Sequence, residues 1–305
     1  MNRAIRCLLL AMACTVASGQ NDSPSRVLTL PEAIKLVTPW VVQIAYDMDE
    51  FPEVTNEALG RPFMIGPAGT GFVVNNDGYV ITALHVLHFF DAVHGIPMPD
   101  GRVLPMGRNR LMIGIAVPNT DTGPLISRAS FTLYQFSVVD KDDTHDLALL
   151  KPDQQLTAFG RPPIFRVSRP EDGQRVAVSG YPVKENVMIT TSGTVASSWG
   201  FNTSQQLLPN GTKIPKLEDV FLVDMHVNHG NSGGPVYLVD TGAVIGVAEA
   251  YRGDDVMSAM PGGVAKPAVD SAGNPLMANA GLGVVTPARF VIALLKRNNV
   301  KWTEH

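Results

Sequence analysis

The chain has 305 residues, of which 45% are hydrophobic and 17% are charged, and its formal net charge is −4. This apolar fraction can bury a substantial core, which excludes wholesale disorder, and the length allows two domains or one large all-β unit. The weak acidity and the lack of a basic run exclude a nucleic-acid partner. After residue 20 the apolar runs are short and interrupted, so we expect no membrane span in the mature chain.

Residues 1–19 predict a signal peptide for export. Two arginines precede a short apolar run, and residues 17–19 supply the small side chains of a cleavage site. An uncleaved membrane anchor and lipid attachment at Cys14 are the alternatives. Cleavage would remove both Cys7 and Cys14, which are the only cysteines, so the mature chain would contain no disulfide. The pattern favours an exported protein, periplasmic or secreted, of a bacterial envelope.

The first element after this segment is a predicted short helix that ends at about Val37. Thr29 and Glu32 have the spacing of a capping box, and Pro39 ends the helix. From Trp40 the sequence becomes β-branched, and short apolar runs are bounded by Gly, Pro, Asn or Asp. The predicted strands are 41–46, 71–74, 79–82, 111–117, 131–139, 147–151, 175–179, 187–190, 220–223, 236–239, 244–248 and 282–286.

Regular short strands with little helix between them favour a sandwich or barrel over βαβ units. The Gly- and Pro-containing stretch 159–163 is the candidate linker between two halves. A final helix is expected from Pro287 to about Arg297. Long loops are predicted over 47–67, 91–110 and 252–280.

Three short sequences carry the chemistry. His85 follows a strand, Asp146 opens an apolar strand, and Ser232 lies in a glycine-rich turn ahead of a strand. A serine hydroxyl becomes nucleophilic when an imidazole takes its proton, and the imidazole needs an acid on its other nitrogen. Glycines on both sides of Ser232 let the N–H groups of Gly230 and Ser232 converge on one point, where an oxyanion would be stabilised.

The order His, Asp, Ser, with TALHVL, HDLALL and NHGNSGGP around these residues, resembles the trypsin-like (chymotrypsin-fold) serine proteases. The likeness is closest to the HtrA/Do family. It extends in patches over roughly residues 30–297, and includes Asn231, where digestive trypsins carry Asp. Further matching stretches are 69–74, 76–82 and 281–287.

The resemblance implies an all-β fold of two six-stranded antiparallel barrels, with a short N-terminal helix and a C-terminal helix. One protease domain would cover 28–298, and the active site would lie between its barrels. By the same resemblance His85 is general base and then acid, Asp146 orients it, and Ser232 attacks to form an acyl-enzyme. Gly230 and Ser232 would form the oxyanion hole. The N-barrel would span about 40–160, the C-barrel about 164–287, and the last helix 288–297.

The implied function is an exported serine endopeptidase that cleaves polypeptide substrates without a cofactor. The HtrA/Do branch usually continues into a PDZ domain, whereas this chain stops at His305, so we expect a protease domain without a PDZ domain. The alternative is a catalytically latent, chaperone-like member of the same fold that only holds peptides. Trimers are common in the resembling branch, which makes a homo-oligomer a possible assembly.

Two residues compete for the specificity pocket. His226 lies six positions before Ser232, where trypsin-like enzymes place the pocket floor, and an imidazole there would favour a polar or acidic P1 residue. In the HtrA-like alignment Val227 would instead shape a small aliphatic pocket. We favour Val227 and leave the substrate preference open.

The remaining histidines receive other interpretations. His85, His88 and Asp91 have spacings that could ligate a metal, but no HExxH or CxxC motif accompanies them, so we predict no metal site. His145 precedes the catalytic acid, and we interpret it as structural. His229 is expected at the rim of the cleft, facing solvent.

Overall fold

The computed structural model describes residues 26–46, 68–88, 96–97, 103–104, 111–117, 130–156, 161–182, 187–207, 213–259, 265–269 and 276–304. The predicted signal peptide, the predicted loop 47–67 and both cysteines lie outside these residues. So do the first two residues of the candidate linker 159–163.

The first half of the described chain contains two short helices and nine strands. These elements are α1 (Leu30–Val37), a 3₁₀ turn (Thr38–Trp40), β1 (Val41–Tyr46), β2 (Gly69–Val73), β3 (Val80–Ala83), α3 (Leu84–His88), β4 (Ile96–Pro97), β5 (Val103–Leu104), β6 (Leu111–Val117), β7 (Ser130–Tyr134), β8 (Phe136–Asp142) and β9 (Leu147–Pro152).

The second half contains ten strands and one helix. They are β10 (Ile164–Phe165), β11 (Arg175–Gly180), β12 (Ile189–Leu207), β13 (Lys213–Asp224), β14 (Pro235–Leu238), β15 (Val244–Asp255), β16 (Met257–Ala259), β17 (Ala265–Pro267), β18 (Met277–Pro287), α4 (Ala288–Arg297) and β19 (Thr303–Glu304).

Helix α1 begins where its sequence predicts. The Glu32 carboxylate accepts hydrogen bonds from both the N–H and the hydroxyl of Thr29, at 2.8 Å each. Glu32 thereby satisfies the first-turn donors that an α-helix leaves free. The helix passes at Val37 into the 3₁₀ turn that contains Pro39, and β1 follows it directly.

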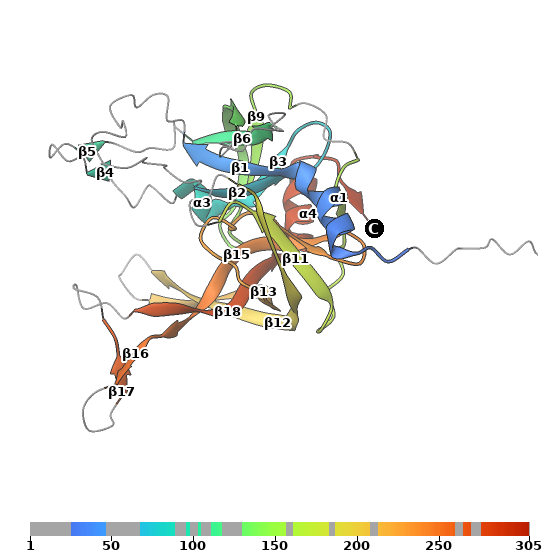
Figure 1. The fold of residues 1–305 in the computed structure, drawn as a ribbon. Helices are drawn as coiled ribbons and strands as arrows, with labels where there is room; N and C mark the ends of the chain where they lie inside the picture. Colours follow the sequence, from blue (N-terminus) through green and yellow to red (C-terminus); the bar gives the residue numbers. More distant parts are fainter. Residues whose placement is uncertain are drawn as a thin grey trace, which may run out of the picture.

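The strands form two large antiparallel units that lie one above the other in Figure 1. The first is a curled sheet of seven strands in the order β7-β6-β1-β2-β3-β9-β8. The second contains a closed barrel of six strands, because β14 pairs with both β11 and β15 at the ends of the series β11-β12-β13-β18-β15. The predicted six strands therefore describe the second unit, and the first is an open seven-stranded counterpart among the described residues.

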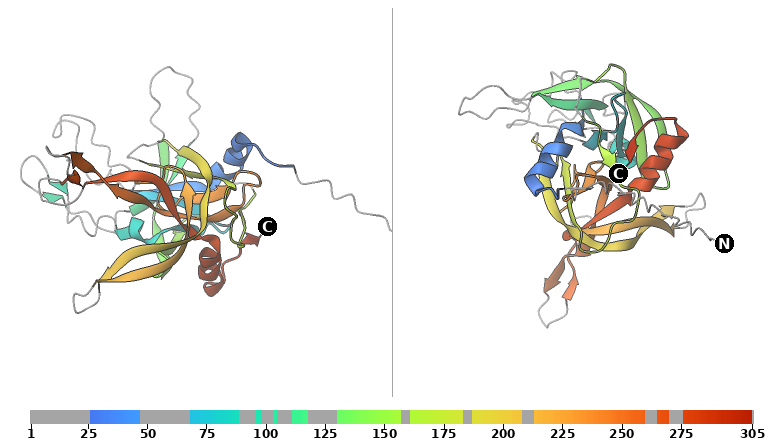
Figure 2. Two further views of the ribbon diagram at one scale, coloured as in Figure 1. Left: turned by 90° about the horizontal axis from the view of Figure 1, so that it is seen from below. Right: turned by 90° about the vertical axis from the view of Figure 1, so that its right-hand side faces the viewer.

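One apolar core joins the two units. Phe72 and Ile81 from the first sheet belong to the same buried cluster as Tyr181 and Tyr237 from the barrel. Helix α4 adds Val291 and other side chains to this cluster. The two helices α1 and α4 lie on opposite sides of the fold in the right-hand view of Figure 2. The seam between the units is thus filled by packed side chains that fix how the two sheets face each other.

Two long hairpins differ from the predictions. The stretch 252–280 is not one long loop: β15 continues to Asp255, β18 begins at Met277, and β16 with β17 forms a small ribbon beyond them. The predicted strands 187–190 and 220–223 are the ends of the much longer β12 and β13. These extensions protrude from the barrel (Figures 1 and 2). Their sequences lack the apolar alternation of a core-facing strand, which explains why the prediction missed them.

Two smaller differences lie in the first half of the chain. The predicted strand 131–139 divides at Gln135 into β7 and β8. The predicted loop 91–110 contains the short strands β4 and β5, and its other residues lie outside the described part of the chain. Within the described residues, no helix has the length and apolar character needed to span a bilayer.

Candidate active site

Asp146 makes two contacts with His85 and one with the residue before it. The Oδ2 atom of Asp146 lies 2.5 Å from Nδ1 of the His85 ring, and its Oδ1 accepts the His85 main-chain N–H at 2.8 Å. The Asp146 carbonyl accepts the N–H of Leu84 at 2.9 Å. Because main chain and ring are bound by one residue, the imidazole is fixed in both position and orientation.

The backbone around this pair explains the local sequence. His85 lies in α3, directly after β3, and Asp146 ends the turn that leads into β9. Strands β3 and β9 pair with Ala83 opposite Leu147, which brings the two residues together although 61 positions separate them. Asp146 has φ 53, a left-handed conformation that aspartate tolerates better than most side chains do. The apolar run Leu147–Leu150 is fully buried, so the acid stands at the end of a rigid strand.

Ser232 lies in a tight turn between β13 and β14, and two glycines allow this turn. Gly230 has φ 98 and Gly233 has φ 85. A side chain on Gly230 would overlap the Tyr181 carbonyl oxygen, and one on Gly233 would overlap the Thr70 carbonyl oxygen. The turn is therefore possible only because both positions lack a Cβ.

The turn is tied to both units. The Ser232 carbonyl accepts the N–H of Thr70 in β2 at 2.9 Å, and the Gly233 N–H donates to Ala248 in β15 at 2.7 Å. A Cβ on Gly233 would also come within 2.9 Å of the Ala83 nitrogen, two residues before His85. The serine turn and the histidine helix thus meet at the seam between the sheets.

The Ser232 hydroxyl is bonded to a main-chain oxygen. Its Oγ donates to the Glu249 carbonyl at 3.0 Å, and no hydrogen bond joins it to the His85 ring, both residues being described. The side chain of His85 is 43% exposed, so its ring is open to solvent on one side. The histidine and its acid are coupled in this conformation, and the serine hydroxyl is turned toward β15.

Two N–H groups of the turn have no acceptor. Neither the main-chain N–H of Gly230 nor that of Ser232 donates to an acceptor within the described chain. The carbonyl of Gly230 instead accepts the Thr70 hydroxyl at 2.6 Å. This bond holds the 230–231 peptide toward β2, and the Asn231 carbonyl, which shares a peptide with the Ser232 N–H, accepts the Gly234 N–H at 2.8 Å.

Electrostatics favour the protonated form of His85. Burial of the ring opposes protonation, but the hydrogen bond and charge of Asp146, with the charge of Glu249, outweigh it, and the pKa of His85 lies above its ordinary value of 6.5. An imidazolium at this position is stabilised by two carboxylates. Such stabilisation suits a base that must hold a proton during a reaction.

The two candidate pocket residues lie in different environments. The His226 side chain is exposed, and its carbonyl accepts the Thr191 hydroxyl at 3.0 Å. Val227 is 1% exposed and packs against Gly283 of β18, where an added Cβ would lie 2.5 Å from a Val227 methyl. Asn279 donates to the Val227 carbonyl at 2.9 Å. Val227 therefore faces the protein interior beside the serine turn.

The other histidines serve separate contacts. His145 contacts other groups than His85. Its Nδ1 lies 2.8 Å from Asp142 Oδ2, and its ring stacks on that of Phe290 in α4 with 3.6 Å between the ring centroids. His229 is exposed, with Nε2 3.3 Å from the Tyr251 hydroxyl. His88 ends α3, and Asp91 lies outside the described residues. Among the described side chains, no three His, Cys, Asp or Glu residues gather where they could hold a metal ion.

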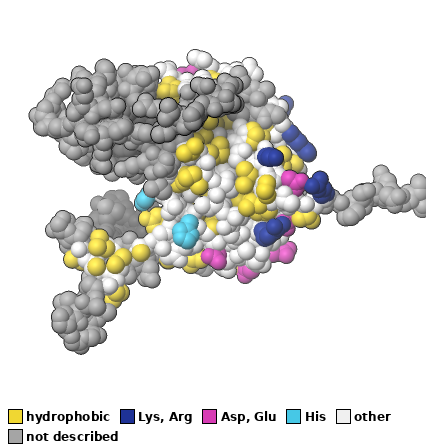
Figure 3. Space-filling model, viewed as in Figure 1, with side chains coloured by type: hydrophobic (Ala, Val, Ile, Leu, Met, Phe, Trp, Pro, Cys, Tyr) yellow, Lys and Arg dark blue, Asp and Glu magenta, His cyan; other side chains and the backbone are white. Residues whose placement is uncertain are grey.

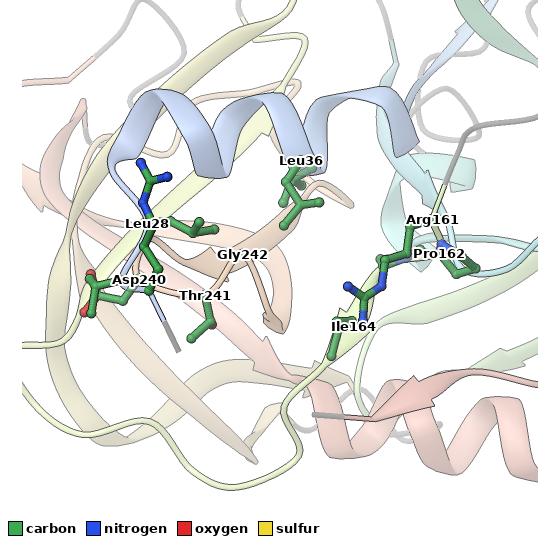
Figure 4. A pocket seen from close by; sticks show the side chains of 12 residues that line it. Leu28, Leu36, Arg161, Pro162, Ile164, Asp240, Thr241 and Gly242 are labelled. Atoms are coloured by element: carbon green, nitrogen blue, oxygen red, sulfur yellow. The ribbon is translucent and has the colours of Figure 1, made fainter. Parts of the chain in front are cut away.

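A cavity of about 310 Å³ lies elsewhere, between α1, the turn 240–242 and the segment 161–164. Figure 4 shows Leu28 and Leu36 on one side of it and Arg161 facing them from the other. On the face shown in Figure 3, charged side chains gather at this end of the molecule and apolar ones toward its middle. None of His85, Asp146 and Ser232 lines the cavity, so it is distinct from the candidate catalytic residues.

Sequence reasoning missed two residues of this centre. Thr70 is fully buried and bonds to three parts of the seam, and Glu249 is 8% exposed beside Ser232 and His85. Neither belongs to a recognisable motif, since a threonine in a strand and a single glutamate are common in any sequence. The stretch 69–74 resembles a family pattern, but that resemblance does not single out Thr70.

A model of a known family matches residues 69–247, and it describes a trypsin-like peptidase domain. The chain belongs to this trypsin-like peptidase family. The matched residues include His85, Asp146 and Ser232 and extend from β2 into β15.

Curated relatives of this trypsin-like chain carry protease names. It is 25% identical over 231 residues to a putative serine protease HhoA of Synechocystis, which covers 73% of this chain and 49% of the relative. It is 27% identical over 210 residues to a probable periplasmic serine endoprotease, DegP-like, of Hahella chejuensis, which covers 66% of this chain and 34% of that protein. The chain thus spans half or less of the length of these relatives.

The fold of the trypsin-like chain is that of a solved protease. The active form of the Rv3671c protease from Mycobacterium tuberculosis superposes with a TM-score of 0.51 at 20% identity. The match covers 89% of this chain and 86% of the other. It confirms the predicted all-β, trypsin-like fold, and the family match confirms the resemblance on which that prediction was based.

Proposed function

We propose that the protein is an exported serine endopeptidase that cleaves polypeptides through His85, Asp146 and Ser232. The observation that carries the proposal is the arrangement at the seam. The ring of His85 is coupled to Asp146 at 2.5 Å, beside a serine turn that leaves two N–H groups free. Membership of the trypsin-like peptidase family and the protease names of the relatives support the same activity.

In the proposed reaction Asp146 keeps the proton of the neutral ring on Nδ1, so that Nε2 can take the proton of the Ser232 hydroxyl. Oγ then bonds to the carbonyl carbon of the substrate, and the oxyanion receives hydrogen bonds from the Gly230 and Ser232 N–H groups. The imidazolium gives its proton to the leaving amine, and an acyl-enzyme remains. Water then gives a proton to Nε2 of His85 as its oxygen bonds to the acyl carbon, and Ser232 Oγ leaves with that proton, which releases the carboxylic acid product. A rotation about the Cα–Cβ bond of Ser232 is needed to move its hydroxyl from the Glu249 carbonyl to Nε2.

For the specificity pocket, we propose Val227 as the residue that shapes it. Its side chain is buried against Gly283, whereas that of His226 is exposed. An apolar wall of this kind suits a small aliphatic P1 residue. A peptide library would be expected to show Ala or Val preferred over Asp or Lys at P1.

Export is proposed from the charged, apolar and small-residue pattern of residues 1–19. The periplasmic DegP-like relatives support the same compartment. Peptide substrates are the partners that a protease requires.

A fluorophosphonate probe tests the activity, because it labels only a serine that a neighbouring base activates. The wild-type chain should be labelled at Ser232 and should cleave casein. Ser232→Ala should abolish both, while an exposed serine change such as Ser137→Ala should affect neither. Labelling that persists in Ser232→Ala would refute the assignment. A wild-type chain that binds unfolded polypeptide but is neither labelled nor active from pH 5 to 9 would instead indicate a latent, chaperone-like protein.

A further inference from the structure

Glu249 occupies an irregular position in β15. Ala248 pairs with Val285 and Ala250 pairs with Val284, which makes Glu249 the extra residue of a β-bulge. Bulges redirect a side chain or a carbonyl relative to the regular strand. Here the Glu249 carbonyl accepts the Ser232 hydroxyl at 3.0 Å. The bulge therefore places this residue directly against the proposed nucleophile.

The carboxyl group of Glu249 is anchored in the interior. The residue is 8% exposed, and its Oε2 accepts the hydroxyl of Thr286, which is 2% exposed, at 3.1 Å. The same hydroxyl lies 3.3 Å from the carbonyl of His145, the residue before Asp146. Thr286 thus connects the Glu249 carboxylate to the loop that holds the catalytic acid.

The carboxylate acts on the His85 ring. The acids that influence the ring are Asp146, which bonds to it directly, and Glu249, whose charge also favours its protonated form. His145 is turned to Asp142 and Phe290, and His88 lies three residues further along the same short helix. Glu249 is therefore a second acid whose charge acts on the ring, and it comes from the barrel, whereas His85 follows β3 of the first sheet.

Resting on the proposed serine-protease function, we propose that Glu249 is a positioning residue of the catalytic centre. Its charge stabilises the imidazolium of His85 in addition to the direct bond with Asp146. No bond to Glu249 forms or breaks: the proton passes from Ser232 Oγ to His85 Nε2 and then to the leaving amine. The carboxylate lowers the free energy of the charged ring between these two transfers.

The consequence is a pH-dependent effect of removing the charge. Without Glu249 the pKa of His85 should fall, so more of the base is neutral in acid solution. The imidazolium would also be less stable, which slows the reaction where the base is already neutral. Relative to wild type, Glu249→Gln should therefore react about 3- to 10-fold slower at pH 8 but at nearly the same rate at pH 5.5, where the larger neutral fraction of the base offsets the slower step. A merely structural defect would lower the rate by the same factor at every pH.

The first measurement does not need activity. In the Ser232→Ala chain, an NMR titration of the His85 ring should give a pKa above 6.5, and adding Glu249→Gln should lower it by about 0.5–1 unit. Asp219→Asn is the control, because it removes the same charge at a different place. Asp219 pairs with Arg169 and Arg289. Equal His85 pKa values with and without Glu249 would overturn the inference.

The second measurement is the rate of fluorophosphonate labelling from pH 5 to 9 in chains with Ser232 intact. The rates of Glu249→Gln and wild type should converge toward pH 5 and separate above the His85 pKa, and Asp219→Asn should follow wild type. A wild-type chain that is never labelled would refute the proposed function, whatever the titration shows. Normal wild-type labelling with parallel pH profiles would refute only the role of Glu249.

If circular dichroism shows that Glu249→Gln does not fold, the His85 titration is repeated with Glu249→Asp. The shorter side chain keeps the charge but withdraws it from the ring, so the His85 pKa should fall by a smaller amount. An unchanged pKa in that folded variant would contradict the inference.

Discussion

The contacts of Asp146 lead to a sharp prediction about its charge. Asp146→Asn would place an amide beside Nδ1 and favour the ring tautomer with its proton on Nε2, which cannot accept the serine proton. Labelling of Ser232 should fall by about 10³–10⁴-fold with little change in circular dichroism. Asp142→Asn is a matched control, because Asp142 holds His145 through the same pair of ring and main-chain contacts. Comparable losses in both variants would contradict a catalytic role for Asp146.

Gly230 tests the serine turn. Gly230→Ala would combine a positive φ with an overlap against the Tyr181 carbonyl oxygen, so the turn must shift. We expect a loss of more than about 2 kcal/mol in the free energy of unfolding, measured in urea, together with a large loss of labelling. Gly173→Ala is the control: its φ is 82, but an added Cβ there meets nothing within 4 Å, and about 1 kcal/mol should be lost. An equal loss of unfolding free energy in both variants would mean that the overlap with the Tyr181 carbonyl is relieved without cost.

Single residues of the site differ in how well the sequence could reveal them. His85, Asp146 and Ser232 lie in short sequences whose chemistry and family resemblance can be recognised without a structure. Thr70 and Glu249 cannot be found in that way, because their roles arise from contacts with residues far along the chain. Glu249 acts at Ser232 only because a bulge in β15 redirects it.

Among the elements, those with local signals were predictable. The capping box defines the start of α1, and Asn75 accepts the N–H of Asp77 in the tight turn between β2 and β3. The extensions of β12, β13, β15 and β18 were missed for a physical reason. The extension of β12 pairs with that of β13, and the extension of β15 pairs with that of β18. Both hairpins protrude from the barrel, so their sequences need not alternate between core-facing and solvent-facing residues.

The outer ribbon of β16 and β17 should contribute little stability. Side chains at its base are exposed, including Val256 at 38%, Met257 at 52% and Leu276 at 43%. Val256 donates to the Leu276 carbonyl at 2.9 Å, so an Asn-Gly turn in place of residues 257–275 could close the hairpin. The melting temperature should change by no more than about 2 °C. A cooperative transition at much lower temperature would show that the ribbon belongs to the core.

At the scale of the whole molecule, the serine turn depends on the contact between the two sheets. The buried cluster that contains Phe72, Tyr181 and Val291 spans both units, in addition to one buried cluster within each unit. Thr70 of β2 crosses this seam. Its hydroxyl donates to the Gly230 carbonyl at 2.6 Å and accepts the Tyr181 N–H at 3.0 Å, while its own N–H donates to Ser232. Both sheets therefore contribute contacts to the turn that carries the two proposed oxyanion donors.

Replacing this hydroxyl should damage stability and activity together. Thr70→Val keeps the shape but leaves the Gly230 carbonyl and the Tyr181 N–H buried without partners, at about 1–3 kcal/mol each. Urea denaturation should show that loss, and fluorophosphonate labelling should slow because the turn is no longer fixed. Thr82→Val removes one buried hydroxyl that bonds only to the Thr70 carbonyl at 2.7 Å, so it should lose stability with less effect on labelling. Thr70→Ser should restore both properties, and wild-type labelling in Thr70→Val would show that the turn holds its geometry without the second sheet.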